Sequence, residues 1–322
     1  MNRETDREAP FDRRSIPADA SETMWRSPDG HEIRTIDWPC RSDDARGSLL
    51  FLPGRGDFYE KYLETLEYWA QEGWRVSAAD WRGQAYSGRL GADERAGHVA
   101  DFSIWVDDLA DFWAAWKAAR PGPHVIVAHS MGGHIALRAL AEGRIDPDAL
   151  ALSAPMLGIQ PSGMPLAILH LFARVMRGLF GADKQAWRGS EKPFRDPDNR
   201  FDLLTHDEAR YADEVWWRKE RPKLWLGAPS WGWIERAIAS ARFLKTDGLL
   251  EAIATPVLFV ATDSDRLVSY PAIAAAAGRI PGARLVHYGE EARHELLREE
   301  DGVRGKVLGV IDQFFDEEAP PQ

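Results

Sequence analysis

The chain has 322 residues, of which 44% are hydrophobic and 28% are charged, and this composition excludes a disordered, collagenous or coiled-coil protein. At a rough guide of about 150 residues per domain, the length allows one large α/β domain or two smaller ones. The net charge of −11 makes nucleic acid an unsuitable partner, since phosphates require a basic face, and the single cysteine, Cys40, excludes a disulfide framework and a cysteine-based metal site.

Both ends of the chain are polar. The first residues, MNRETDREAPFDRRS, are charged throughout and contain no apolar stretch of the kind found in secretory signals. No run of 18 apolar residues occurs, so no transmembrane helix is predicted. We therefore expect a cytoplasmic protein in which residues 1–20 and 317–322 are flexible tails.

Short strands and then an alternation of strands and helices are predicted from residue 21 to residue 155. Residues 23–39 have the pattern of a β-hairpin that turns at Pro28-Asp29-Gly30. The elements expected after it are a strand at 48–52, a helix at 58–71, a strand at 75–79, a helix at 102–119, a strand at 124–128, a helix at 131–141 and a strand at 149–153.

The alternation stops at residue 156 and resumes at residue 247. Residues 156–246 are helical, aromatic and irregular in pattern, and they are followed by a strand at 256–261, a helix at 271–279, a strand at 284–288 and a helix at 302–315. This order predicts an α/β fold, with a mostly parallel sheet covered by helices on both faces. We expect a core of residues 21–155 and 247–316, with residues 156–246 inserted as a helical cap. Catalytic and ligand-binding residues are expected just after the carboxyl ends of the strands.

Ser130 is the candidate nucleophile. It follows the strand at 124–128 and precedes a helix, which is the strand–turn–helix context of a nucleophile elbow. The pattern G-x-S-x-G reads Ala128-x-Ser130-x-Gly132 here, and the small flanking residues suit a tight turn. The alternative is a serine that only caps the helix, a contribution of about 1 kcal/mol.

A serine nucleophile requires a base and an orienting carboxylate. His294 is the candidate base because it lies in the loop after the last predicted strand. Asp263 and Asp265 both follow the preceding strand, and we favour Asp265 because apolar residues come after it. The order Ser130, Asp265, His294 is the one expected for this fold.

The oxyanion of the intermediate requires preorganised N–H donors. One is expected from Met131, the residue after the nucleophile. The second is assigned to the N–H of Arg55, which has a glycine on each side in the loop after the strand at 48–52. A simple Gly/Pro turn is the alternative for this loop, and a phosphate site is disfavoured because no G-K-[ST] follows.

With these residues in place, the chain resembles the α/β-hydrolase superfamily, and within it the lysophospholipase and monoacylglycerol lipase branch. The matching segments are PGRGDFYEKY (53–62), DWRGQAYSG (80–88), AHSMGG (128–133), SAPM (153–156), GW (232–233), DSDRLV (263–268) and ARHE (292–295). Ala85 and Ala128 stand where the family usually has glycine, and Pro53 stands where many members have histidine. The resemblance implies a serine hydrolase that needs no cofactor and no metal.

The predicted cap has a net charge of +4, from 15 basic and 11 acidic residues, which leaves −15 for the rest of the chain. In residues 166–180, His170, Arg174 and Arg177 form one polar stripe on an otherwise apolar helix. Such a helix suits peripheral contact with the inner face of a membrane, where anionic head groups would meet the arginines; a cap helix packed on the protein with its arginines in solvent is the alternative.

The cap also carries six of the 14 tryptophans. Their amphipathic rings suit the wall of an acyl pocket, and Trp231, Trp233 and Phe172 are the predicted substrate-binding residues. Another part of the tryptophans is expected in the core, on the helix at 102–119.

The predicted function is ester hydrolysis on a lipid with one acyl chain, a lysophospholipid or a monoacylglycerol, through an acyl-enzyme on Ser130. An aminopeptidase or a general carboxylesterase on the same scaffold is the alternative, and Glu214, Glu220 and Glu235 are available to bind a substrate amine. A non-catalytic binding module is disfavoured because Ser130, Asp265 and His294 are all present. The oligomeric state stays open.

Overall fold

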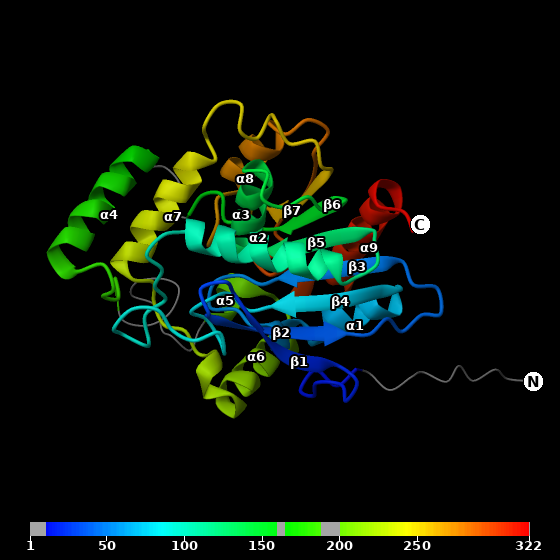
Figure 1. Cartoon of the computed structure of the whole chain (residues 1–322). Coiled ribbons are helices and arrows are strands. Elements are labelled where there is room, and N and C mark those ends of the chain that lie inside the picture. Colours follow the sequence, from blue (N-terminus) through cyan, green and yellow to red (C-terminus); the bar gives the residue numbers. More distant parts are fainter. Residues whose placement is uncertain (1–10, 160–164, 188–199, 322) are drawn as a thin grey trace, which may run out of the picture.

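A twisted eight-stranded sheet forms the centre of the computed structural model, which describes residues 11–159, 165–187 and 200–321 (Figure 1). The strand order is β1-β2-β4-β3-β5-β6-β7-β8. β1 pairs antiparallel with β2, and β2 pairs antiparallel with β4, whereas the pairs from β4 through β3 to β8 are all parallel. The predicted α/β architecture is confirmed.

Strands β3 to β8 lie within one residue of their predicted positions, and β1 begins two residues before the predicted hairpin. Their bounds are β1 Ser21–Arg26, β2 Glu32–Trp38, β3 Gly47–Leu52, β4 Trp74–Ala79, β5 His124–His129, β6 Ala149–Ser153, β7 Val257–Thr262 and β8 Arg284–Tyr288. Every residue of β3, β6 and β7 is buried. Both faces of the sheet are therefore covered, which explains why these strands are unbroken apolar runs in the sequence.

The core helices also follow the prediction. They are α1 Leu63–Gln71, α2 Ser103–Ala118, α3 Ser130–Ala141, α8 Tyr270–Ala277 and α9 Asp301–Glu318, with a short 3-10 helix, η3, at Leu296–Arg298. One difference is that the helix predicted to start at Phe58 begins as a separate 3-10 turn, η1, at Tyr59–Tyr62.

The insertion between β6 and β7 is helical and has the position of a cap. Its elements are α4 Leu166–Phe180, α5 Phe201–Leu204, α6 Glu208–Glu220, the 3-10 helix η2 Pro222–Leu224, and α7 Trp231–Phe243. Helices α4 and α7 lie side by side at the left of Figure 1, while α5 and α6 lie lower, and α6 packs against η1. Residues 160–164 and 188–199 of the predicted cap lie outside the described residues.

The predicted tails are shorter than expected. Helix α9 continues to Glu318, and Ala319 is buried, so the tail predicted to begin at residue 317 was placed too early. At the other end, Arg13 donates from Nε to Asp213 at 2.6 Å, which ties residues within the predicted 1–20 tail to the cap; residues 1–10 lie outside the described part. Among the described helices, none is long and apolar enough to span a bilayer.

Candidate active site

Ser130 stands at a sharp turn between β5 and α3. Its backbone adopts the left-handed conformation, with φ of 51°, which a non-glycine residue tolerates only where the surrounding structure holds it. Space around the turn is minimal: a Cβ added to Gly132 would lie 2.6 Å from the carbonyl oxygen of Leu52, and one added to Gly133 would lie 2.9 Å from Cβ of Pro155. The turn therefore has the geometry of a nucleophile elbow.

The structure brings the three predicted catalytic residues together. His294 Nε2 lies 3.0 Å from Ser130 Oγ, and His294 Nδ1 lies 2.6 Å from Asp265 Oδ2. All three side chains are buried. With a proton on Nδ1 donated to Asp265, Nε2 accepts the hydroxyl proton of Ser130, which is the arrangement that general-base activation requires.

The choice of Asp265 over Asp263 agrees with the geometry. Asp265 Oδ1 accepts the N–H groups of Leu267 and Val268 at 2.7 and 2.9 Å, so the apolar residues after it hold its carboxylate in place. Asp263 instead pairs with His287 at 3.1 Å, where both side chains are exposed to about half.

Burial and charge act in opposite directions on the pKa of His294. Burial, the largest single effect, opposes protonation of the ring, but the charge and hydrogen bond of Asp265 together with the charges of Glu295 and Asp57 outweigh it, and the pKa is raised. The neighbouring His129 behaves differently: burial, helped by the positive charge that His294 carries when protonated, lowers its pKa to about 4. His129 is therefore neutral at pH 7, with Nδ1 donating to the carbonyl of Ser153 at 3.1 Å.

The loop of the predicted oxyanion hole is held on both sides of Arg55. Gly54 N donates to Asp57 Oδ2 at 3.2 Å, and Gly56 N donates to Gln84 Oε1 at 2.6 Å. A Cβ on Gly54 would lie 3.1 Å from Cβ of Ser130, so the loop passes directly beside the nucleophile. The Arg55 side chain donates to the carbonyl of Gly227 at 2.6 Å, which fastens the loop to the cap. The roles of Arg55 and Met131 as N–H donors stay predictions.

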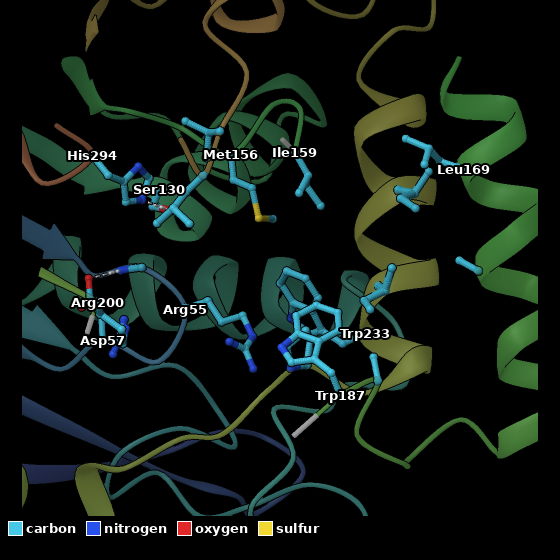
Figure 2. A pocket seen from close by; sticks show the side chains of 18 of the residues that line it. Arg55, Asp57, Ser130, Met156, Ile159, Leu169, Trp187, Arg200, Trp233 and His294 are labelled. Carbon is cyan, nitrogen blue, oxygen red and sulfur yellow. Dashed lines mark hydrogen bonds between the residues drawn. The ribbon is translucent and has the colours of Figure 1, made fainter. Parts of the chain in front are cut away.

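A cavity of about 590 Å³ opens next to Ser130 and His294, between the core and the cap (Figure 2). The predicted residues Trp231, Trp233 and Phe172 all line it. Lining residues that were not among the predicted substrate-binding residues include Met156, Ile159, Leu169, Ala173, Trp187, Arg200, Leu204, Ile234, Ile238, Leu267 and Val268. Met156 and Ile159 follow β6 and Leu267 follows β7, so their position after a strand end was a usable signal.

Two of the three residues of the predicted polar stripe on α4, His170 and Arg177, point toward α7, whereas Arg174 is in solvent, as the interpretation of a helix packed on the protein expects. His170 Nε2 lies 2.7 Å from Glu235 on α7, Arg177 Nη1 lies 3.0 Å from the same carboxylate, and Arg242 donates to His170 Nδ1 at 2.8 Å. Only Arg174 of the three is exposed. His170 and Arg177 turn inward because α7 supplies the buried carboxylate of Glu235, and large apolar side chains of α4 face outward.

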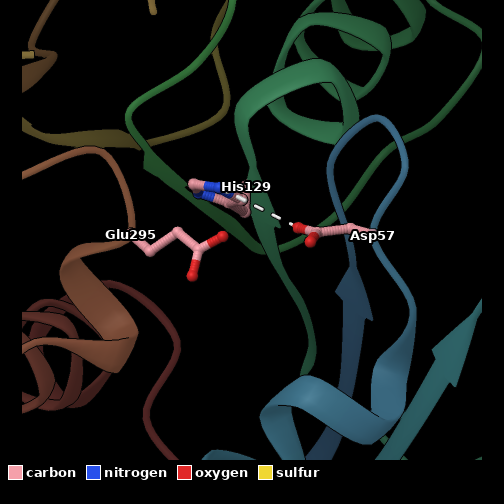
Figure 3. A group of neighbouring side chains, drawn as sticks. All are labelled: Asp57, His129 and Glu295. Carbon is pink, nitrogen blue, oxygen red and sulfur yellow. Dashed lines mark ion pairs between the residues drawn. The ribbon is translucent and has the colours of Figure 1, made fainter. Parts of the chain in front are cut away.

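A buried ionic cluster lies behind the site. Asp57, His129 and Glu295 come from three separate segments and bring ligand atoms within 4.8 Å of one another (Figure 3). This donor set could hold a metal ion. However, the Lys61 ammonium already contacts Asp57 and, at 2.5 Å, Glu295, so a side chain supplies the cation there. The sequence analysis gave Lys61 no role.

Comparison with known proteins identifies the family. The family described as serine aminopeptidase, S33, matches residues 43–301. The chain belongs to this family. It is an α/β-hydrolase, as its resemblance implied.

Two curated relatives carry related names. The chain is 34% identical over 318 residues to lysophospholipase L2 of Escherichia coli strain K12, with 92% of this chain and 90% of the relative covered. It is 25% identical over 278 residues to the probable lysophospholipase L2 of Haemophilus influenzae, with 84% of each chain covered.

Solved structures confirm the fold. A soluble variant of monoglyceride lipase from Saccharomyces cerevisiae superimposes with a TM-score of 0.75 at 18% identity, covering 96% of this chain and 98% of that one. A thermostable carboxyl esterase from Bacillus coagulans gives a TM-score of 0.72 at 16% identity, covering 93% and 98%. At such low identities these structures support the fold alone.

Proposed function

We propose that the chain hydrolyses carboxylic esters of lipids that carry one acyl chain, lysophospholipids or monoacylglycerols. The observation that carries this proposal is the cavity beside Ser130, whose walls are mainly apolar side chains of the cap and of the loops after β6 and β7. An acyl chain gains free energy by leaving water for such a surface, at about 0.8 kcal/mol per CH₂. The 34% identity to lysophospholipase L2 over most of both chains supports the same substrate class.

In the proposed mechanism, Ser130 attacks the ester carbonyl while His294 takes the hydroxyl proton. Asp265, held by two backbone N–H groups, keeps the imidazole in the required tautomer and stabilises its charged form. The N–H groups of Met131 and Arg55 receive the oxyanion. His294 then protonates the departing alcohol, and in the second half it activates a water molecule that releases the fatty acid from Ser130.

The described carboxylates favour an ester over a peptide with a free amine. Glu214 is buried against Lys61 and Arg298, and Glu235 is buried against His170 and Arg177. Glu220 is exposed at the end of α6. None of these three, which an aminopeptidase could use, lines the cavity. The acidic residues that do line it within the described chain, Asp57 and Glu295, are both paired with Lys61.

Peripheral membrane contact through α4 is part of the same proposal. Its outer face exposes half or more of each of six large apolar side chains: Ile168, Leu171, Phe172, Val175, Leu179 and Phe180. A helix with this face lies well in the boundary between lipid head groups and acyl chains. The apolar face, rather than the arginines of the sequence-based prediction, would then make the contact.

Vesicle sedimentation tests the membrane contact. The double variant Leu171→Ser, Leu179→Ser is expected to lower the vesicle partition coefficient about tenfold or more, because each leucine that moves from water into the lipid contributes about 1.5–3 kcal/mol. Met24→Ser on β1 is the matched control, since Met24 is also exposed, at 46%, but lies on the edge strand of the sheet. Equal binding of all three proteins would refute the contact through α4.

The proposed reaction is tested with Ser130→Ala. Loss of a triad serine typically lowers kcat on the order of 10⁶-fold, so the variant should lose turnover of lysophospholipid, monoacylglycerol and p-nitrophenyl esters, and labelling by a fluorophosphonate probe. Ser42→Ala is the control, because Ser42 lies in the loop before β3, at the amino ends of the parallel strands, whereas Ser130 lies at their carboxyl ends. This variant should keep ester turnover and probe labelling. Appreciable turnover in a folded Ser130→Ala protein would contradict the assignment, and hydrolysis of aminoacyl amides alone would contradict the substrate class.

A further inference from the structure

Lys61 is a fully buried cation that contacts three carboxylates. Its side chain has no exposed surface, and its Nζ lies against Asp57, 2.5 Å from Glu295 and 3.0 Å from Glu214. A buried charge is retained in a protein only where its partners are well placed, because the loss of hydration is costly. The carboxylates hold the pKa of Lys61 above its usual value against the effect of burial, so the ammonium stays charged.

Each carboxylate belongs to a different part of the proposed site. Asp57 closes the oxyanion loop, where its Oδ2 accepts the N–H of Gly54 at 3.2 Å. Glu295 is the residue after His294, and its own N–H donates to the carbonyl of Leu204 on α5 at 2.8 Å. Glu214 is on α6 of the cap. One ammonium therefore joins the oxyanion loop, the histidine loop and the cap.

We propose that Lys61 is a positioning residue for the ester hydrolysis proposed above, on which this inference rests: it fixes the distance between the oxyanion loop and the histidine loop and couples both to the cap. Without the ammonium, the carboxylates of Asp57 and Glu295 would face each other as like charges at short range. The loops would separate, and the N–H donors would lose their alignment with Ser130 and His294. A misplacement of about 1 Å at reacting groups costs about 10²-fold in rate.

The same ammonium balances charge around His294. The groups facing His294 are Asp265, Glu295, Asp57 and His129, and the groups facing Lys61 besides its three carboxylates are Arg298 and Tyr62. Removing Lys61 leaves Asp57 and Glu295 less compensated, which favours protonation of His294. Since the base must be unprotonated, the acidic limb of the kcat/KM profile should move to higher pH.

Lys61→Met keeps most of the side-chain volume and removes the charge. With p-nitrophenyl butyrate, we expect kcat to fall on the order of 10²-fold, and a fall of at least tenfold is required by the proposal. KM should stay within about threefold of the wild-type value. The acidic limb should move up by about half a pH unit or more. Fluorophosphonate titration counts the competent molecules, so that a lower folded fraction is not mistaken for a lower kcat.

Arg34→Met is the matched control. Arg34 is also a buried cation, bonded to Glu60 at 2.7 Å and to Asp80 at 2.6 Å, but its partners belong neither to the oxyanion loop nor to the histidine loop. This variant should lose stability in urea and keep the kcat and the acidic limb of the wild type. A change in kcat and pH profile as large as that of Lys61→Met would show a general effect of removing a buried cation and would overturn the proposal.

Asp57→Asn provides a second variant if Lys61→Met does not fold. It is nearly isosteric and keeps an acceptor for Gly54 and Tyr62, but it loses the charge that Lys61 contacts. Its kcat should also fall at least tenfold at nearly constant KM. Wild-type kcat and pH profile in the folded variants would refute the positioning role and leave the function intact. Turnover of p-nitrophenyl butyrate without turnover of lipids would refute the substrate class and leave the Lys61 comparison valid.

Discussion

Adding one methyl group at Gly132 should lower both the stability and the activity of the protein. It lies in the first turn of α3, two residues after Ser130. A methyl group there would lie 2.6 Å from the carbonyl oxygen of Leu52 and closer still to that of Pro53. Both are backbone atoms at the end of β3, in the middle of the sheet, and cannot move aside as a flexible side chain would.

The magnitude follows from two opposing effects. Alanine in place of glycine inside a helix contributes about 1 kcal/mol of stability. Overpacking of a rigid interior costs about 1–3 kcal/mol, occasionally more. Since both contacts are with backbone, we expect the upper part of that cost and a net loss of about 1–2 kcal/mol in Gly132→Ala. A shift of Leu52 and Pro53 also moves Gly54 and Arg55, so kcat should fall on the order of 10²-fold.

Gly309→Ala is the control with the opposite expected sign. Gly309 is in the middle of α9, and a Cβ there would have nothing within 4 Å, so the helix should gain about 0.5–1 kcal/mol at unchanged kcat. Urea unfolding gives the two free energies of unfolding, and p-nitrophenyl butyrate gives kcat. A Gly132→Ala protein as stable and active as Gly309→Ala would show that the elbow is not closely packed against β3.

Further outcomes are expected at other positions. Asp265→Asn should lower kcat about 10⁴-fold and, because Asp265 raises the pKa of His294, move the acidic limb of kcat/KM to lower pH; an unmoved limb would contradict this. Trp231→Ala should raise the KM for a long-chain ester tenfold or more but change the KM for an acetate ester less than threefold, as steady-state kinetics on the two substrates would show. The folded state lowers the pKa of His129 from 6.5 to about 4, so only the unfolded chain takes up this proton as the pH is lowered through that range. The free energy of unfolding should therefore decrease from pH 6.5 to pH 4 more steeply in the wild type than in His129→Asn; equal pH dependence in the two proteins would refute the shift. Ala85 has φ of 45°, which glycine adopts without strain. Ala85→Gly should therefore increase the free energy of unfolding by up to about 1 kcal/mol, seen as a higher urea midpoint; a lower midpoint would show that the backbone at Ala85 is not strained.

The sheet and the three residues of the proposed triad could be predicted because their signals are local. A parallel strand buried on both faces is a short unbroken apolar run, as in β3 and β7. Each of Ser130, Asp265 and His294 follows such a run within a few residues. The fold then brings the ends of neighbouring strands together, and residues far apart in sequence meet without any further signal being needed.

The ionic contacts of the site could not be predicted in the same way. Lys61 lies within DFYEKY, at the start of a predicted helix where a lysine is usually in water, and its partner Glu295 is 234 residues away. Whether such a lysine is in water or buried depends on whether distant loops bring carboxylates to it. The spacing of Asp57 and Lys61, four residues apart, is a local signal for one of these pairs, but no local pattern links Lys61 to Glu214 or Glu295.

The orientation of α4 shows the same limit and connects the cap to the proposed substrate. Periodicity identified a polar stripe, but the side of α4 that meets the protein was decided by Glu235 on α7, 65 residues from His170. The six exposed apolar residues leave on the order of 10 kcal/mol of burial free energy unused while they stay in water. Phe172 belongs to this face, at 54% exposed, and also lines the cavity of Ser130. If α4 lies in a lipid surface, the cavity opens beside that surface, and an acyl chain can pass from lipid to the cavity of Ser130 without crossing bulk water.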